Sequence, residues 1–262
     1  YRNINVVHGR TDRIDYGVGA HASRASVLTG SAVNATALAV RKKALETAAE
    51  LLQMRAEDLT ISRGVVHQKS NSEGPSLSLG EIAEALLPTA KERGKKVPYL
   101  AAEEWFNIDH QTYPYGHHIC AVKVDPETGG VEIEKYFIAY DIGRSINPML
   151  VDGQLVGGLA QGLGGSLFEE FCYDAEGQPL SVTFADYLIP TMHEVPKPEI
   201  LLTEDFPSIR TPIGIKGAGE AGITGAAASI ASAIDNAIGI PGAVKQIPVS
   251  PQRLKEIIKS QN

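Results

Sequence analysis

Hydrophobic and polar residues alternate along two stretches of this chain that flank a short polar turn. Residues 119–124 and 131–136 place apolar side chains at every second position, which is the period of a strand with one buried face. The intervening residues 125–130 read Asp-Pro-Glu-Thr-Gly-Gly, and these residue types commonly close a hairpin. The pattern therefore predicts an antiparallel hairpin.

Three longer stretches have the pattern of helices. Residues 27–52 and 226–238 combine helix formers with small apolar residues. Residues 149–171 also predict a helix, although each of its glycines weakens it by about 1 kcal/mol relative to alanine. We further expect a strand at 5–8, a hairpin at 59–67 that turns at Arg63 and Gly64, a helix at 78–87, a strand at 199–203 and a closing helix after residue 247, with a polar surface loop at 68–76.

This order of elements predicts an α+β chain with two lobes of mixed sheet and long glycine-rich helices. We expect residues 97–108 to cross between the lobes. The first lobe is then predicted to span residues 1–105 and the second residues 106–262. A chain of 262 residues with 43% hydrophobic composition is long enough to bury a substantial core in this way.

Composition and charge narrow the classes of function. The net charge of -7 and the pI near 5.5 argue against a broad electrostatic contact with nucleic acid or an anionic membrane, and favour small-molecule or protein partners. Cys120 and Cys172 have no metal-site spacing, which fits a reducing compartment, so we expect a cytoplasmic protein. No apolar run approaches the length that spans a membrane.

The glycine-rich stretch 215–225 has a single carboxylate, Glu220, just before the predicted helix 226–238. Glycines allow a large group to approach the main chain, and the amides and dipole of a helix start favour an anion. A structural interpretation makes Glu220 a helix-stabilising charge. A functional interpretation makes it a catalytic group beside a bound anion.

A second loop rich in small residues, 16–26, leads into the helix predicted at 27–52. Ser23 and Arg24 in this loop are either a helix cap and a surface cation, or contacts to a phosphate or cofactor. Gln161 is a polar side chain among the glycines of helix 149–171. Those glycines indicate either close packing against another backbone or close approach of a ligand.

Two nucleotide-binding interpretations fail. Residues 217–222 match G-x-G-x-x-G, but residues 210–214 are a poor buried strand, and the next acidic residue, Asp235, lies within the following helix. A phosphate-binding Walker loop fails because Lys216 precedes the glycines. The adjacent His117 and His118 point to opposite faces of a strand, which makes joint ligation of one metal unfavourable. A non-catalytic scaffold remains an alternative.

Four motifs in order along the chain resemble the molybdenum-binding subunit of the xanthine dehydrogenase / aldehyde oxidase / carbon monoxide dehydrogenase family. They are Gly17-x-Gly19-x-x-Ala22-Ser23-Arg24, Tyr140-Asp141-Ile142-Gly143-x-x-Ile146-Asn147-Pro148, Gly153-Gln154-x-x-Gly157-Gly158-x-x-Gln161-Gly162 with Glu169-Glu170, and Lys216-Gly217-x-Gly219-Glu220. Together they cover nearly the whole chain.

The resemblance implies a molybdenum hydroxylase that inserts water-derived oxygen at an electron-poor carbon of an N-heterocycle or aldehyde, or that oxidises carbon monoxide. Glu220 matches the family's general base. The resemblance further implies a molybdenum–molybdopterin cofactor, in its cytosine dinucleotide form, with no metal ligand from the protein itself. The residues that match the cofactor-binding segments are Ala22, Ser23, Arg24, Ala25, Ser26, Gln161, Gly162, Lys216, Gly217 and Gly219.

Family subunits extend several hundred residues further towards the N-terminus than this chain. We therefore expect this chain to be the C-terminal half of a molybdenum-binding unit and to be inactive without partners. The expected partners are the N-terminal half, an iron–sulfur subunit and often an FAD subunit, because two isolated cysteines cannot hold a four-thiolate cluster. The alternative is a catalytically silent structural or assembly subunit that keeps the fold.

Overall fold

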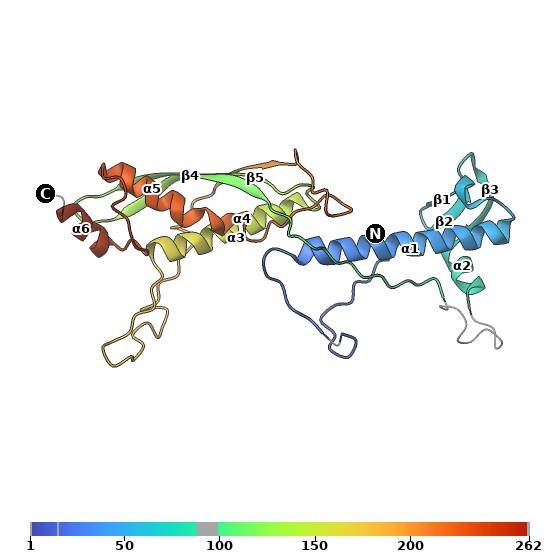
Figure 1. The fold of residues 1–262 in the computed structure, drawn as a ribbon, viewed down its shortest axis with the longest axis horizontal. Helices are drawn as coiled ribbons and strands as arrows, with labels where there is room; N and C mark the ends of the chain where they lie inside the picture. Colours follow the sequence, from blue (N-terminus) through green and yellow to red (C-terminus); the bar gives the residue numbers. More distant parts are fainter. Residues whose placement is uncertain (1, 15, 88–98, 261–262) are drawn as a thin grey trace.

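The computed structural model describes residues 2–14, 16–87 and 99–260. Two bodies lie at opposite ends of an elongated molecule, and the long helix α1 (Ala25–Leu52) runs from one towards the other (Figure 1). Its C-terminal part packs on the first sheet, while its N-terminal part reaches the second body, where Gly30 lies close to Ile213 and Ile215. Helix α1 therefore joins the two bodies.

The first body is a small antiparallel sheet covered by helices. Its strands are β1 (Leu59–Ser62), β2 (Val65–Gln68) and β3 (Asn71–Ser78), with β2 in the centre. A short 3₁₀ turn (Ala56–Asp58) precedes the sheet and α2 (Leu79–Ala85) follows it. Ser78 and Glu81 form a capping box at the start of α2, which explains why this short helix begins there. The core consists of Leu45, Ala48, Leu59, Val66 and Ile82.

The second body is built on a mixed sheet. Strands β4 (Tyr115–Val124) and β5 (Val131–Asp141) are antiparallel, and β6 (Glu199–Thr203) pairs in parallel with β5. Its helices are α3 (Pro148–Leu167), α4 (Ala221–Thr224), α5 (Ala226–Ile238) and α6 (Pro251–Lys259). The main core joins sheet and helices through side chains that include Tyr136, Ile138, Leu155, Leu159, Leu163, Ile230, Ile234 and Leu254.

Glycines bring α3 close to α4 and α5. A methyl group added at Gly158 would lie 2.8 Å from the Cα atom of Gly222, and one added at Gly162 would lie 2.5 Å from the Cβ atom of Ala226. Both positions therefore need glycine for close backbone packing. Gly153 and Gly157, by contrast, have open space around them. The structural explanation of the glycine-rich helix holds for the buried side of α3.

The structure confirms the α+β class, the hairpin and the main helices. Residues 5–8 form no strand, so that prediction was wrong; their side chains are exposed, and an isolated apolar stretch has nothing to pair with there. The polar loop predicted at 68–76 was also wrong, because residues from Asn71 onwards form the edge strand β3. Part of the predicted crossing at 97–108 lies outside the described residues. The lobe boundary at 105 stays a prediction.

Extended segments leave both bodies. Residues 99–114 run back along α1 (Figure 1), where Lys43 Nζ donates a hydrogen bond of 2.6 Å to the carbonyl of Tyr99. Residues 169–198 form a long excursion between α3 and β6 that projects from the second body (Figure 1). Across the described ranges, no helix is both long and apolar enough to cross a membrane.

Candidate functional site

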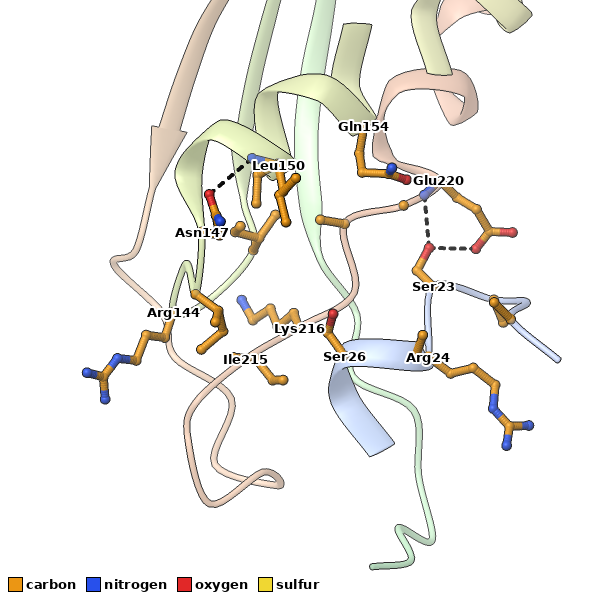
Figure 2. Close-up of a pocket in the computed structure, with 18 of the residues that line it drawn as sticks. Ser23, Arg24, Ser26, Arg144, Asn147, Leu150, Gln154, Ile215, Lys216 and Glu220 are labelled. Atoms are coloured by element: carbon orange, nitrogen blue, oxygen red, sulfur yellow. Dashed lines mark hydrogen bonds between the residues drawn. The ribbon is translucent and has the colours of Figure 1, made fainter. Parts of the chain in front are cut away.

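A cavity of about 580 Å³ lies where the start of α1 meets the second body (Figure 2). Three segments far apart in the sequence form its walls: the loop that enters α1, the loop that enters α3, and residues 215–220. We call residues 214–220 the strap. The lining residues are Ala20, His21, Ala22, Ser23, Arg24, Ala25, Ser26, Ile142, Arg144, Ile146, Asn147, Leu150, Val151, Gln154, Ile215, Lys216, Ala218, Gly219 and Glu220.

Glu220 is linked to the α1 loop by two hydrogen bonds to one side chain. The Ser23 hydroxyl donates to Glu220 Oε2 at 2.9 Å and accepts from the Glu220 backbone amide at 2.9 Å (Figure 2). These residues are 197 positions apart in the sequence. Glu220 is exposed at the cavity wall and immediately precedes α4, a short helix that the sequence did not predict and that lies between Glu220 and the predicted helix 226–238. Within the described chain, its second carboxylate oxygen has no hydrogen-bond partner.

The loop that carries Ser23 has an unusual backbone. Ala22 and Ser23 adopt left-handed conformations, with φ of 50° and 53°. Non-glycine residues avoid this region, and such conformations persist where the surroundings enforce them. Gly217 supplies part of that enforcement, because a methyl group there would lie 2.5 Å from Ser23 Cβ. The strap and the α1 loop thus fit closely against each other.

Lys216, which lines the cavity, forms a buried ion pair with Asp141, which does not. Its ammonium lies 2.9 Å from Asp141 Oδ1, and the two side chains are 8% and 4% exposed. Burial alone raises the pKa of the Asp141 carboxyl, but the hydrogen bond from Lys216 and those from two backbone amides outweigh it and lower the pKa to about 2. Asp141 is therefore ionised throughout the physiological range.

The start of α3 forms the opposite wall. Asn147 caps this helix by accepting a hydrogen bond from the Leu150 amide at 3.3 Å, and Pro148 occupies the first turn (Figure 2). One turn further, Gln154 reaches the cavity, and its Oε1 lies 3.4 Å from the position of a methyl group built on Gly219. An amide side chain thus faces the glycine next to Glu220.

Cationic side chains and the start of a helix line the cavity, an arrangement that favours an anion. Helix α1 begins after Arg24 with no side chain capping its first amides and no acidic residue in its first turn. Arg24 and Arg144 belong to the lining and project outward on two sides (Figure 2). An uncapped helix start flanked by arginines suits phosphate or another polyanion.

The predicted site residues are partly brought together. Residues 22–26, Lys216, Gly219 and Glu220 all line the cavity, and Gly217 packs directly behind it on Ser23. Gln161 and Gly162 are not among the lining residues; Gly162 packs on Ala226 instead. Gln154, two turns earlier on α3, lines the cavity instead. The sequence analysis also missed the roles of Asn147 and Asp141, although both stand in the quoted motif 140–148.

The histidine pair lies away from this cavity. His118 Nε2 lies 2.9 Å from the carbonyl of Ala221 and its Nδ1 lies 2.9 Å from the Tyr136 hydroxyl, so both ring nitrogens are engaged. A carbonyl can only accept, which places the proton on Nε2. Burial lowers the pKa of His118, against the opposing effect of the Ala221 carbonyl. The described residues contain no cluster of three or more His, Cys, Asp or Glu that could hold a metal.

Comparison with known proteins identifies the family to which this chain belongs. Residues 1–196 match the family described as "Molybdopterin cofactor-binding domain". The chain is 40% identical over 252 residues to the 6-hydroxypseudooxynicotine dehydrogenase complex subunit gamma of Paenarthrobacter nicotinovorans, a match that covers 96% of this chain and 32% of that protein.

Two solved structures have the same fold. The carbon monoxide dehydrogenase of Oligotropha carboxidovorans superposes with a TM-score of 0.84 at 30% identity, over 95% of this chain and 31% of that one. The quinoline 2-oxidoreductase of Pseudomonas putida 86 superposes with a TM-score of 0.80 at 32% identity, over 93% and 31%. The chain therefore spans about a third of the length of these relatives. It belongs to the molybdopterin cofactor-binding domain family and is part of a molybdenum-binding subunit of the xanthine dehydrogenase family.

Proposed function

We propose that this chain forms one wall of the active site of a molybdenum hydroxylase and that Glu220 is its general base. The observation that carries the proposal is the Ser23–Glu220 contact at the wall of the cavity. A carboxylate held by one oxygen and its own amide has a fixed direction, while its second oxygen stays available to accept a proton. Ser23 therefore orients the base.

The cavity fits the family's cofactor by the chemistry of its donors. The uncapped amides at the start of α1 would hold the phosphates of a cytosine dinucleotide form, and Arg24 and Arg144 would add positive charge at the rim of the cavity. Gly219 and the amide of Gln154 would let the flat pterin end approach the strap. When bound, the cofactor supplies the two-electron oxidation and the oxygen-transfer chemistry that protein side chains lack.

We infer that the substrate is an N-heterocycle. Two of the three relatives described above are named for a nicotine derivative and for quinoline, and the first of them is the more similar to this chain in sequence. The apolar side chains of Ile142, Ile146 and Leu150 in the cavity lining offer a flat aromatic ring more apolar surface than a diatomic gas needs. Aldehydes and carbon monoxide are the competing substrates in the assay.

The size of the exposed surface of this chain supports the presence of a large partner polypeptide. The chain exposes 17891 Å², whereas a compact monomer of its mass exposes roughly 11,000 Å². The excess is several times larger than the roughly 800 Å² that each partner contributes to a standard interface. Much of it is apolar, as at Phe184 and Met192 on the excursion 169–198, which are 78% and 86% exposed. We propose that the N-terminal half of the molybdenum-binding unit covers this surface, with iron–sulfur and FAD subunits completing electron transfer.

The decisive experiment compares Glu220→Gln with Glu134→Gln in the purified assembly. Glu134 is an exposed carboxylate on β5 outside the cavity, so its variant controls for loss of one surface charge. Removing a general base lowers kcat by about 10²–10⁴, and we expect this loss only for Glu220→Gln, with molybdenum and cytidine nucleotide contents unchanged.

Wild-type turnover in Glu220→Gln would remove Glu220 from the mechanism. A fully assembled native complex without molybdenum and without cytidine nucleotide would instead support the alternative, a silent structural subunit. Turnover assays against an N-heterocycle, an aldehyde and carbon monoxide identify the substrate class.

A further inference from the structure

We propose that Lys216 is a positioning residue: with Asp141 it forms a buried anchor that fixes the strap and thereby places Glu220, and it does not bind the cofactor. The inference rests on the proposed role of Glu220 and goes beyond it, because it assigns the cation nearest to the base in sequence to a different task. It also replaces the expectation from the sequence motif, in which Lys216 contacts the cofactor.

Every acceptor position on Asp141 is used. Oδ1 accepts hydrogen bonds from Lys216 Nζ at 2.9 Å and from the Gly143 amide at 2.9 Å. Oδ2 accepts from the Thr203 hydroxyl at 3.2 Å and from the Phe206 amide at 3.1 Å. The carboxylate therefore connects the ends of β5 and β6 to the strap, and Lys216 is the only cation among these donors.

The ammonium of Lys216 is likewise engaged in contacts within the protein. Besides its bond to Asp141, it lies 4.3 Å from the centre of the Tyr115 ring, within the range of a cation–π contact. Its side chain is 8% exposed, whereas Arg24 and Arg144 project outward at the rim (Figure 2). A cation neutralised by a buried carboxylate attracts a phosphate weakly, because the pair has no net charge. The arginines are the groups left for the anionic cofactor.

Backbone hydrogen bonds next to the Lys216–Asp141 ion pair also hold the strap. The Lys216 amide donates to the Ile142 carbonyl at 2.8 Å, and the Arg144 amide donates to the Gly214 carbonyl at 2.9 Å. These bonds flank a bridge between Gly143 and Ile215, so the strap begins as a short antiparallel ladder on the end of β5. The ladder and the ion pair fix the same residues.

The strap is thus held at both ends. Lys216 secures its beginning to β5, and four residues later the amide and carboxylate of Glu220 are held by Ser23. The intervening Gly217 packs against Ser23 and leaves little space for alternative paths. Removing the Lys216 ammonium leaves a buried carboxylate without its counter-charge, which is strongly unfavourable. The strap is then expected to shift or open, and Glu220 loses its direction.

The test measures amide hydrogen exchange in the assembled protein for wild type, Lys216→Met, Lys216→Arg and Ser23→Ala. In Lys216→Met we expect exchange of the hydrogen-bonded amides of residue 216, Arg144 and Glu220 to accelerate by about tenfold or more, with α5 unchanged, because only the local opening is affected. Lys216→Arg keeps a cation within reach of Asp141 and should restore most of the protection. Ser23→Ala releases the other end and should accelerate the Glu220 amide alone.

Two further readouts separate positioning from cofactor binding. Molybdenum and cytidine nucleotide contents should stay at wild-type levels in Lys216→Met, while kcat falls and KM for the substrate is unchanged. If Lys216→Met does not fold, the double variant Asp141→Asn with Lys216→Met removes both charges and reports on the same strap.

Wild-type exchange in the strap of Lys216→Met overturns the proposal, as does equal acceleration in the strap and in α5, which indicates a purely global effect. Loss of molybdenum in proportion to kcat overturns it too, because Lys216 is then a cofactor contact. Failure of the proposed function is distinguishable: it shows as a wild-type assembly without molybdenum or as a fully active Glu220→Gln variant, whereas strap exchange needs neither cofactor nor turnover.

Discussion

Two adjacent glycines on α3 provide a test of how the fold places Glu220. Gly158 faces α4, and a methyl group there would lie 2.8 Å from Gly222 Cα and 2.9 Å from Ile223 N. Gly157 has no heavy atom within 4 Å of the same position. Replacement by alanine is therefore expected to have opposite effects on stability at these two neighbouring sites. At Gly158 it separates two backbones, whereas at Gly157 it only adds a helix former.

The expected magnitudes follow from these surroundings. Alanine in a helix interior is more stable than glycine by about 0.5–1 kcal/mol, so Gly157→Ala should raise the free energy of unfolding by that amount. Gly158→Ala gains the same propensity but overpacks a rigid backbone contact, for which about 3 kcal/mol is the upper end of the usual cost. The net expectation for Gly158→Ala is a loss of about 2 kcal/mol.

Thermal unfolding followed by circular dichroism measures both variants. For a chain of this size each kcal/mol shifts Tm by about 2–4 °C, so Tm should rise by about 2 °C in Gly157→Ala and fall by about 6 °C in Gly158→Ala. Since α4 directly follows Glu220, the second variant should also disturb the hydrogen bond to Ser23. Shifts of the same sign in both variants would refute the close-packing argument.

Two further predictions concern stability. The pKa of Asp141 is depressed from 3.8 to about 2 in the folded state, so its contribution to the free energy of unfolding is present above about pH 4 and is lost as the pH falls towards 2. This contribution amounts to about 2 kcal/mol. Asp141→Asn should therefore flatten this part of a Tm-against-pH curve, and an equally steep curve would contradict the prediction. Among the described residues, the fully buried Ser31 Oγ on α1 has no hydrogen-bond partner. Ser31→Ala should therefore raise the free energy of urea unfolding by about 1 kcal/mol, and a decrease would contradict this prediction.

Local patterns were sufficient to predict much of the fold. The hairpin of β4 and β5 combines alternation with a turn of specific composition, and the helices α1 and α5 carry long runs of helix formers. Strand β3 lacks both signals, since it contains Gly74 and Pro75 and is mostly exposed. An edge strand of this kind forms because β2 offers it a partner, and that information is not local.

The site could be predicted only in part, for a geometric reason. Gln154 and Gln161 lie on similar faces of α3 because seven residues make nearly two full turns, but they are separated by about 10 Å along the axis. Periodicity could not decide which glutamine reaches the cavity. The Asp141–Lys216 pair was equally inaccessible, because its members are 75 residues apart and meet only when the strap pairs with the end of β5.

The position of the cavity explains why Glu220 could not be interpreted from its own sequence neighbourhood. A carboxylate before a short helix does not by itself indicate a functional site. Here Ser23, at the start of α1, holds the carboxylate at one wall, and Lys216 fixes the strap on the other side. Each contact links a different pair of distant segments, so the direction of Glu220 is a property of the assembled bodies. The family relation indicates that this geometry binds a molybdopterin cofactor. The base proposed here, Glu220, depends on several segments for its placement, so substitutions at Ser23 or Lys216 should lower kcat even though Glu220 itself is intact.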